Sequence, residues 1–337
     1  LPKGTEHFLS DLHGEYEAFC HIMNNCSGVI REKVERLYGN SMTKRERDEF
    51  ATLIYYPSAI IAEKKGRGED DKDWYLVQLH RLVEVCRTVS SKYTRSKVRK
   101  ALPKYFDYII DELINMDRDD FDKEAYYGEI FTSIIELGRA EAFVVKRLAV
   151  DTLHIVGDLF DRGENPDKIL DLLIAHHNAD VQWGNHDIQW MGAHMGNEAC
   201  ILSVVDISLK YGNADLLEEG YGISLRKLSA YASETMDDDP RFYPVGTDAR
   251  RAGDEARSIA KMRKAAYLMQ LKAEGHILER RPEYGMAERS ILRNVDFAAG
   301  EFCGHSLGGA SFPGIDPKFP LAFSAAECEG IEGLKRS

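Results

Sequence analysis

Three short polar motifs, each placed directly after a strand-sized apolar run, constrain this chain more than any other feature. They are Ser10-Asp11-Leu12-His13-Gly14, Gly157-Asp158-Leu159-Phe160-Asp161-Arg162-Gly163 and Gly184-Asn185-His186-Asp187. From Asp158 to Asn185 is 27 residues, the size of one strand–helix–strand crossover, so we expect the second and third strands to be parallel neighbours. Ligands of open α/β sheets collect at the carboxyl ends of strands. The pattern therefore predicts an α/β fold in which three loops share one site.

Hydrophobic periodicity places the other elements. Strands are predicted at 7–10, 152–156 and 180–183, and helices at 16–30 and 166–175. Further helices are predicted at 32–38, 44–54, 73–90 and 96–115, with an exposed loop at 64–71, and beyond the third motif up to 205, at 215–232 and at 256–279. From residue 300 the chain is rich in Gly and Pro, so we expect a poorly ordered tail with one short hairpin before Phe312.

These elements suggest four parts. Residues 1–30 and 141–235 form the core, residues 31–140 a large helical insertion, and residues 236–300 a helical segment. Residues 301–337 are expected to begin a C-terminal part that is incomplete in this chain. The first residues lack both Met and an apolar signal region, so the start of the parent protein is expected to be absent as well.

Bulk properties exclude several classes of partner. The net charge of −12 over 337 residues disfavours binding to nucleic acid and to anionic membranes, and it suits a small charged substrate held by local cations. The longest apolar runs are too short to span a bilayer. The six cysteines are scattered without a CxxC pair, which favours reduced thiols and a cytoplasmic location. The sequence leaves a homo-oligomer open.

The motif side chains match the ligand preferences of a two-metal hydrolase, which needs oxygen donors and imidazoles. Asp11 and His13 are two residues apart, so an extended loop can turn both toward one ion. Asp158 is the expected bridging carboxylate, and Asn185 offers an amide oxygen to the second ion. Such a pair of ions supports hydrolysis of phosphate esters.

The remaining motif residues are expected to act on the substrate. His186 would protonate or hydrogen-bond the leaving oxygen, and Asp187 would orient that imidazole. Arg162 presents a planar fork for phosphate oxygens, so Arg162, Asn185 and His186 are the predicted phosphate contacts. Each motif also has a plainer interpretation, with Arg162 in a surface ion pair or Asp187 as a helix cap. The fixed order and spacing of all three favours the metal site.

The motifs resemble the calcineurin-like metallophosphoesterase superfamily, whose pattern is D-x-H, G-D-x-x-D-R-G and G-N-H-D or G-N-H-E. Longer stretches are similar to the class III fructose-1,6-bisphosphatases of bacteria, among them 5–19, 147–158, 182–187, 274–283 and 312–318. The resemblance implies a metallophosphoesterase-like sheet sandwich flanked by helices. It also implies hydrolysis of D-fructose 1,6-bisphosphate to D-fructose 6-phosphate and phosphate, a gluconeogenic step, with two manganese ions as cofactor.

Class III enzymes carry their remaining metal-binding histidines beyond the position where this chain ends. His194, His276 and His305 are the histidines left after Asp187, and of these His194 and His305 are the candidate late ligands. The resemblance therefore predicts a truncated chain with an incomplete second metal site. Two alternatives stay open: a protein or nucleotide phosphoesterase of the same superfamily, and a non-catalytic remnant that serves as a binding module.

Overall fold

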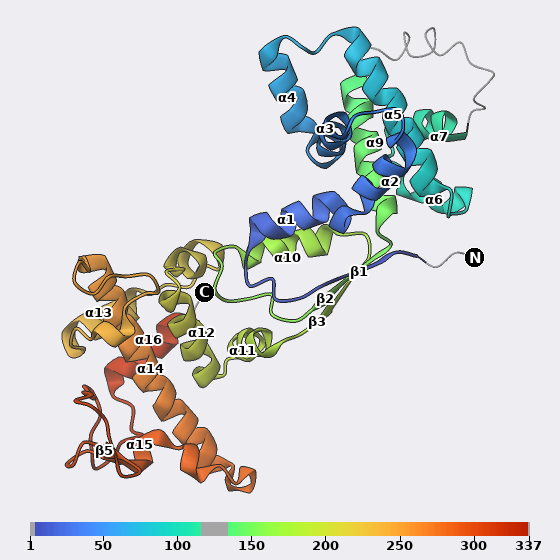
Figure 1. The fold of residues 1–337 in the computed structure, drawn as a ribbon. Helices are drawn as coiled ribbons and strands as arrows, with labels where there is room; N and C mark the ends of the chain where they lie inside the picture. Colours follow the sequence, from blue (N-terminus) through green and yellow to red (C-terminus); the bar gives the residue numbers. More distant parts are fainter. Residues whose placement is uncertain (1–3, 116–133, 336–337) are drawn as a thin grey trace. The chain divides into compact units, whose positions relative to one another are not determined.

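The computed structural model describes residues 4–115 and 134–335. The chain contains many helices and a few short strands (Figure 1). It is therefore a mixed α/β protein, as the motif spacing predicts. It divides into two compact units. We call residues 1–9, 17–155 and 175–180 the helical unit, and residues 10–16, 156–174 and 181–337 the motif unit. Within the described stretches, no helix has the length and apolarity that crossing a membrane requires.

Three strands form a sheet in the order β1 (Glu6–Leu9), β2 (Thr152–Val156) and β3 (Ala179–Gln182). β1 and β2 are parallel. Leu153 N donates to Asn178 O (3.0 Å) at the start of β2, and Gly157 N donates to Gln182 O (3.1 Å) just past its end. From the first of these bonds to the second, the residue number rises from 153 to 157 along β2 and from 178 to 182 along β3. The two strands therefore also run parallel. The predicted crossover between the second and third motifs is confirmed.

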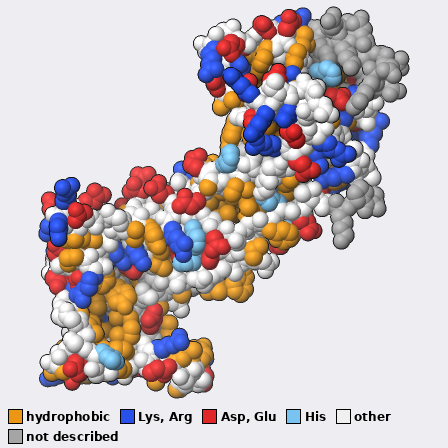
Figure 2. Space-filling view, in the orientation of Figure 1, with side chains coloured by type: hydrophobic (Ala, Val, Ile, Leu, Met, Phe, Trp, Pro, Cys, Tyr) orange, Lys and Arg blue, Asp and Glu red, His pale blue; other side chains and the backbone are white. Residues whose placement is uncertain are grey.

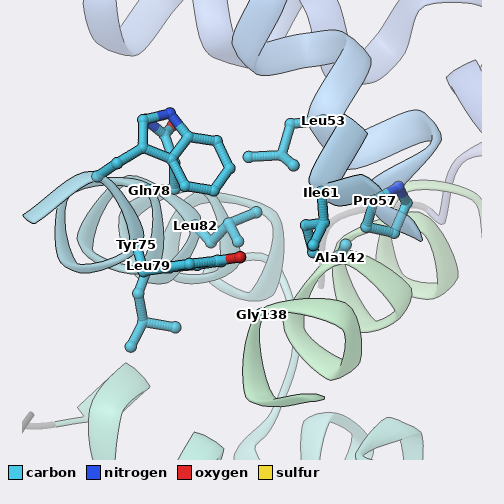
Figure 3. A pocket seen from close by; sticks show the side chains of 10 residues that line it. Leu53, Pro57, Ile61, Tyr75, Gln78, Leu79, Leu82, Gly138 and Ala142 are labelled. Carbon is cyan, nitrogen blue, oxygen red and sulfur yellow. The ribbon is translucent and has the colours of Figure 1, made fainter. Parts of the chain in front are cut away.

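The helical unit is built from most of α1 (Tyr16–Asn25) and from α2 (Val29–Tyr38), α3 (Lys44–Tyr55), α4 (Pro57–Arg67), α5 (Lys72–Ser90), α6 (Arg95–Ala101), α7 (Asp107–Asn115) and α9 (Ile134–Ala149). α5 and α9 pack along each other, and α5 buries Leu79, Leu82 and Cys86 at helical spacing. A gap of about 20 Å³ remains beside residues such as Leu53 and Tyr75 (Figure 3). Since that volume exceeds the needs of one water only slightly, we regard it as a packing gap.

Three predicted boundaries in this unit are wrong. α1 ends at Asn25 instead of continuing to residue 30, because Cys26, Ser27 and Gly28 adopt left-handed φ values of 51°, 50° and 85°. The predicted loop at 64–71 is helical up to Arg67, and Gly68 (φ 66°) ends that helix. The predicted helix at 96–115 is two helices, since Pro103 disfavours helical backbone in the residue before it.

Within the helical unit, Asp151 connects the residue before β1 to the segment between α5 and α6 and to α6 itself. Its carboxylate accepts hydrogen bonds from the Thr5 backbone N–H (2.7 Å), the Tyr93 hydroxyl and the Lys97 ammonium. Burial by itself raises the pKa of Asp151. The bonds from Lys97, Tyr93 and Thr5, together with the charge of Lys92, outweigh burial and bring the pKa to about 2.

This low pKa predicts an acid-sensitive unit. The folded-state pKa lies below the ordinary value of 3.8, so the stabilisation is complete above pH 3.8 and is lost as the pH falls toward 2. We expect Asp151→Asn to reduce the pH dependence of the unfolding free energy in that window, measured by urea unfolding at several pH values. Asp171→Asn, which changes an exposed carboxylate, is the control. An unchanged pH profile in Asp151→Asn would contradict the assignment.

The motif unit contains most of α10 (Pro166–Ala175), α11 (Asn185–His194), α12 (Glu198–Lys210), α13 (Arg226–Thr235), α14 (Asp254–Arg280), α15 (Ile291–Asn294), α16 (Ala325–Lys335) and an antiparallel sheet of β4 (Val295–Asp296), β5 (Glu301–Phe302) and β6 (His305–Ser306). α12 packs on α14 around buried Leu202, Val205 and Met269. The short hairpin expected before Phe312 is confirmed by the pairing of β5 with β6.

The segment after residue 300 is more regular than expected. It ends in α16, a helix that the Gly-rich sequence did not predict. Lys272 Nζ on α14 lies 2.8 Å from both carboxylate oxygens of Glu327 on α16, and the Tyr231 hydroxyl donates to Glu327 at 3.0 Å. Lys272 and Glu327 are each 1 % exposed, so a buried, fully bonded ion pair attaches this helix to α14.

Candidate metal centre

The first two motif loops continue the hydrogen-bond ladder of the parallel strands. Asp11 N donates to Gly157 O (3.1 Å) and His13 N donates to Asp158 O (2.8 Å). In the opposite direction, Gly163 N donates to His13 O at 2.7 Å. All of these residues belong to the motif unit. The loops after β1 and β2 are therefore held against each other through their backbones, which fixes where their side chains start.

Left-handed backbone is concentrated in these loops. Asp11, His13, Asp158, Asp161 and Arg162 have φ values of 54°, 44°, 57°, 69° and 74°. Such values are uncommon for residues that carry a Cβ atom, although Asp and His tolerate them better than most. Residues held in sparsely populated backbone regions cluster at functional sites. The distribution supports a functional role for both loops.

Two glycines of the motifs are required by close packing. A Cβ atom on Gly163 would lie 2.5 Å from His13 O, so the first and second loops could not approach as they do. A Cβ atom on Gly184 would lie 2.1 Å from Asp158 Oδ1. Glycine at these positions is what lets the three loops converge.

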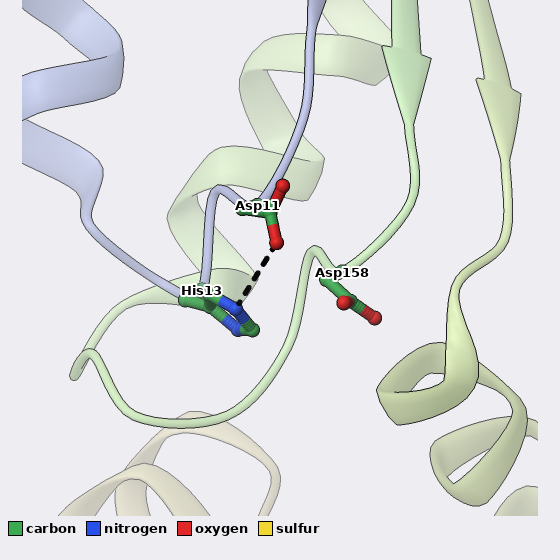
Figure 4. A group of neighbouring side chains, drawn as sticks. All are labelled: Asp11, His13 and Asp158. Atoms are coloured by element: carbon green, nitrogen blue, oxygen red, sulfur yellow. Dashed lines mark ion pairs between the residues drawn. The ribbon is translucent and has the colours of Figure 1, made fainter.

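Asp11, His13 and Asp158 form the centre of the site (Figure 4). One ligand atom from each lies within 4.8 Å of the others, and among residues 4–115 and 134–335 this is the one group of His, Cys, Asp or Glu that could hold a metal ion. The His13 Nδ1–H donates to Phe160 O (3.0 Å), which leaves Nε2 facing Asp11 Oδ1 at 3.8 Å. Metal-ligating histidines commonly have this arrangement, with the second nitrogen bonded to a carbonyl. The donor set therefore fits a divalent ion.

Asp187 lies at the junction of the second and third loops, and its role differs from the predicted one. Its carboxylate is buried and accepts hydrogen bonds from four backbone N–H groups. The donors are Asp158 N (2.8 Å), Leu159 N (2.8 Å), Phe160 N (3.3 Å) and Gly184 N (2.8 Å). The expectation that Asp187 orients the His186 imidazole is corrected, because these bonds direct its oxygens toward the backbone of the loops.

The partner of His186 is Asp161, a residue that we did not single out from the sequence. His186 Nδ1 lies 2.7 Å from Asp161 Oδ2, and Trp190 Nε1 donates to Asp161 Oδ1 at 2.9 Å. Asp161 is 2 % exposed. His186 in turn meets His13 edge-on, with ring centroids 5.3 Å apart. The available signal was the second aspartate of G-D-x-x-D-R-G, but its partner lies 25 residues further along the chain.

The two remaining phosphate candidates are exposed. Asn185 is the first residue of α11, and Arg162 follows Asp161 in the second loop. In the described stretches neither side chain has a recorded hydrogen bond or ion pair. The backbone beside Arg162 is held firmly, because buried Asn213 donates from Nδ2 to Arg162 O (3.1 Å) and Gly163 O (3.0 Å). Arg162 therefore combines a fixed backbone with an available guanidinium.

The late histidines lie outside the metal-ligating group. His194 ends α11, His305 is an exposed residue of β6, and His276 Nε2 lies 2.8 Å from Leu321 O. None of the three belongs to the group of Asp11, His13 and Asp158.

Parallel strands with this cluster at their ends define an α/β protein with a candidate metal site. The chain belongs to the Firmicute fructose-1,6-bisphosphatase family, whose model matches residues 1–337. It is 46% identical over 351 residues to the class 3 fructose-1,6-bisphosphatase of Bacteroides thetaiotaomicron, covering 100% of this chain and 53% of the relative. A class 3 relative from Clostridium tetani is 44% identical over 349 residues, with coverages of 100% and 53%.

The chain thus spans about half the length of the curated relatives it matches. No solved structure is a significant match.

Proposed function

We propose that the protein is a metal-dependent phosphomonoester hydrolase that converts D-fructose 1,6-bisphosphate to D-fructose 6-phosphate and phosphate, a step of gluconeogenesis. The observation that carries this proposal is the family match over the whole chain, which includes all three motif loops. The convergence of Asp11, His13 and Asp158 supports it, because phosphate ester hydrolysis is a frequent use of such donor sets.

Asp11, His13 and Asp158 would hold the metal, and Asn185 would contribute to a second ion. We propose that the metal is manganese and that two ions are bound. Bound divalent ions supply Lewis acidity to the phosphoryl oxygens and to the attacking water. The ligand chemistry fits, since carboxylate and imidazole donors suit such ions.

The other side chains would bind phosphate and move a proton. The guanidinium of Arg162 would grip phosphoryl oxygens with its paired N–H donors. His186 Nε2 is the ring nitrogen left open by the bond from Nδ1 to Asp161, so it can donate to the leaving oxygen. The buried Asp161 carboxylate would keep the imidazole ring in place. Asp187 would act indirectly, by fixing the loops that carry these groups.

The proposal also covers the sheet architecture, the domain bounds, the cellular location and the substrate. The metallophosphoesterase-like sandwich is supported by a sheet face that is uncovered within the described stretches, where Phe8 is 60% exposed and stacks on His154. We retain residues 1–30 and 141–235 as the core, 31–140 as the insertion, 236–300 as the helical segment and 301–337 as a separate part. A cytoplasmic location is supported by six free cysteines, and a small sugar bisphosphate is the proposed partner.

Substrate profiling tests the proposal. The chain and a full-length class 3 relative would be assayed side by side with manganese on fructose 1,6-bisphosphate, a phosphopeptide and a dinucleotide polyphosphate. We expect phosphate release from the sugar bisphosphate by both proteins. Preference for the phosphopeptide or the dinucleotide would favour another phosphoesterase activity. If the chain released nothing while the relative was active, the binding-module alternative would replace the hydrolase for this chain.

Arg162 gives a second, independent test of the site. In the manganese-loaded chain, removing its guanidinium in Arg162→Ala should weaken binding of inorganic phosphate at the metal centre about tenfold or more, since hydrogen bonds to charged groups contribute about 1.5–3 kcal/mol. Manganese binding should change little, because Arg162 is outside the metal-ligating group. Calorimetric titrations of both ligands would measure this, with Arg162→Lys as the charge-conserving control. Equal loss of phosphate and metal binding would count against the phosphate role.

A further inference from the structure

The helical unit contains a cavity that is separate from the metal centre. It has a volume of about 730 Å³ and lies between α2, the end of α5 and the end of α9. All of its lining residues belong to the helical unit, whereas the motif residues of the metal centre belong to the other unit. The size falls within the range of small-molecule sites.

The lining of this cavity is predominantly cationic. Lys33 and Arg36 lie three residues apart on α2, so both occupy one face of the helix. Arg87 from α5 and Lys92 from the following turn complete the set, and Glu32 is the one carboxylate among the lining residues. We call the cavity that these four basic side chains line the cationic cavity. Figure 2 shows Lys and Arg side chains over the region of α2 and α6 in this unit.

Two of the four cations are already committed to the fold. Arg87 donates to Glu84 Oε1 (2.8 Å) and to Leu113 O (2.7 Å). Lys92 Nζ donates to Thr5 Oγ1 at 2.7 Å and lies 3.5 Å from Asp151 Oδ2. These bonds make Arg87 and Lys92 fixed walls of the cavity.

The two cations of α2 are much less neutralised. Lys33 Nζ lies 3.8 Å from Glu32 Oε1, near the outer limit of an ion pair, and the Glu32 side chain is 72% exposed. Arg36 is exposed and has no recorded ion pair within the described stretches. Surface pairs of this kind contribute little. Lys33 and Arg36 are therefore available to a ligand.

The charges also repel one another. Burial lowers the pKa of Lys92, the Asp151 carboxylate opposes that shift, and the positive charges of Lys33 and Lys97 lower the pKa further. Lys33 and Lys92 line the same cavity, so their like charges repel each other there. An anion between them would relieve this repulsion and gain from both ammonium groups.

The rest of the lining limits the kind of anion. Val29, Leu37, Val89 and Ala149 give the cavity an apolar surface that suits a carbon skeleton. The ammonium groups of Lys33 and Lys92 and the guanidinium of Arg36 suit a compact dianion such as a phosphoryl group. We propose that the cationic cavity binds a small phosphorylated molecule at a site distinct from the metal centre.

Inorganic phosphate is the probe that tests this site. It would be titrated by calorimetry into the metal-free 337-residue chain, with hydrogen exchange used to locate the protected amides. We expect protection in α2 and around Ser91, and about a tenfold or greater loss of affinity in the double variant Lys33→Gln, Arg36→Gln. Arg31→Gln is the matched control on the same helix, because Arg31 pairs with Asp48 and does not line the cavity.

Arg162→Ala separates this site from the metal centre. Phosphate protection of α2 should persist in that variant, and the result does not depend on metal or turnover, so failure of the proposed hydrolase activity would leave it unaffected. Unchanged thermal unfolding of the double variant would show that it is folded. A variant with Lys33→Gln and Arg36→Lys keeps one of the two positive charges, so it should bind phosphate more tightly than the double variant. Three results would overturn the site: no bound phosphate, protection confined to the motif loops, or full affinity in the double variant.

Discussion

Asp187→Ala is expected to destabilise the motif unit by about 3 kcal/mol or more. The carboxylate accepts four backbone hydrogen bonds within a buried site. A buried donor left without a partner costs about 1–3 kcal/mol, and water entering the vacated space would recover only part of the total. Urea unfolding would measure the change.

A second helix supplies the control for this prediction. Asp254 also lies in the first turn of its helix, but it is exposed, so Asp254→Ala should alter the unfolding free energy by about 1 kcal/mol at most. Asp187→Asn should fall between the two, since an amide keeps one acceptor oxygen and brings an N–H₂ group toward other donors. If Asp187→Ala were as mild as the Asp254 change, the junction role of Asp187 would have to be abandoned.

Asp158→Asn is expected to abolish or severely weaken metal binding while leaving the fold intact. Loss of outer-shell partners of metal ligands already costs about 10–100-fold in affinity, and replacing a direct carboxylate ligand should cost at least as much. In the described stretches the side chain accepts one hydrogen bond, from His186 N to Oδ1 at 3.3 Å, so stability should change little. Manganese titration by calorimetry would measure the loss.

The same titration on a control variant keeps the interpretation specific. Asp180→Asn removes an exposed carboxylate of β3 that pairs with His154 and lies outside the metal-ligating group. It should bind manganese like the unmodified chain. Manganese affinity retained in Asp158→Asn would exclude the ligand role, and in the longer relatives the equivalent change is expected to abolish hydrolysis.

The sequence predicted elements best where periodicity was strong and flanked by clear breaks. The strand at 152–156 and the helix at 166–175 have the predicted bounds. Pro103 was a usable signal for the break between α6 and α7 and was overlooked. α16 was missed because Gly330 and Gly333 weaken helix propensity, and its stability depends on the pair between Lys272 and Glu327, which are far apart in sequence.

The residues of the candidate site were likewise predictable only in part. Asp11, His13 and Asp158 were predicted to lie together from their positions after strands, and the structure brings them together. The bonding of Asp187 could not be predicted, because it depends on the tertiary path that aims the backbone N–H groups of the second loop at one point. The same holds for Asp161, whose partner His186 comes from a different loop.

The left-handed residues of the first two loops bear on how the protein assembles. A short peptide copying either loop would relax to ordinary backbone angles, because the neighbouring strands and the Asp187 carboxylate are what hold the unusual ones. Affinity for metal should therefore be gained late during refolding and lost early during denaturation. Manganese release would then precede the loss of helical circular dichroism as denaturant is raised.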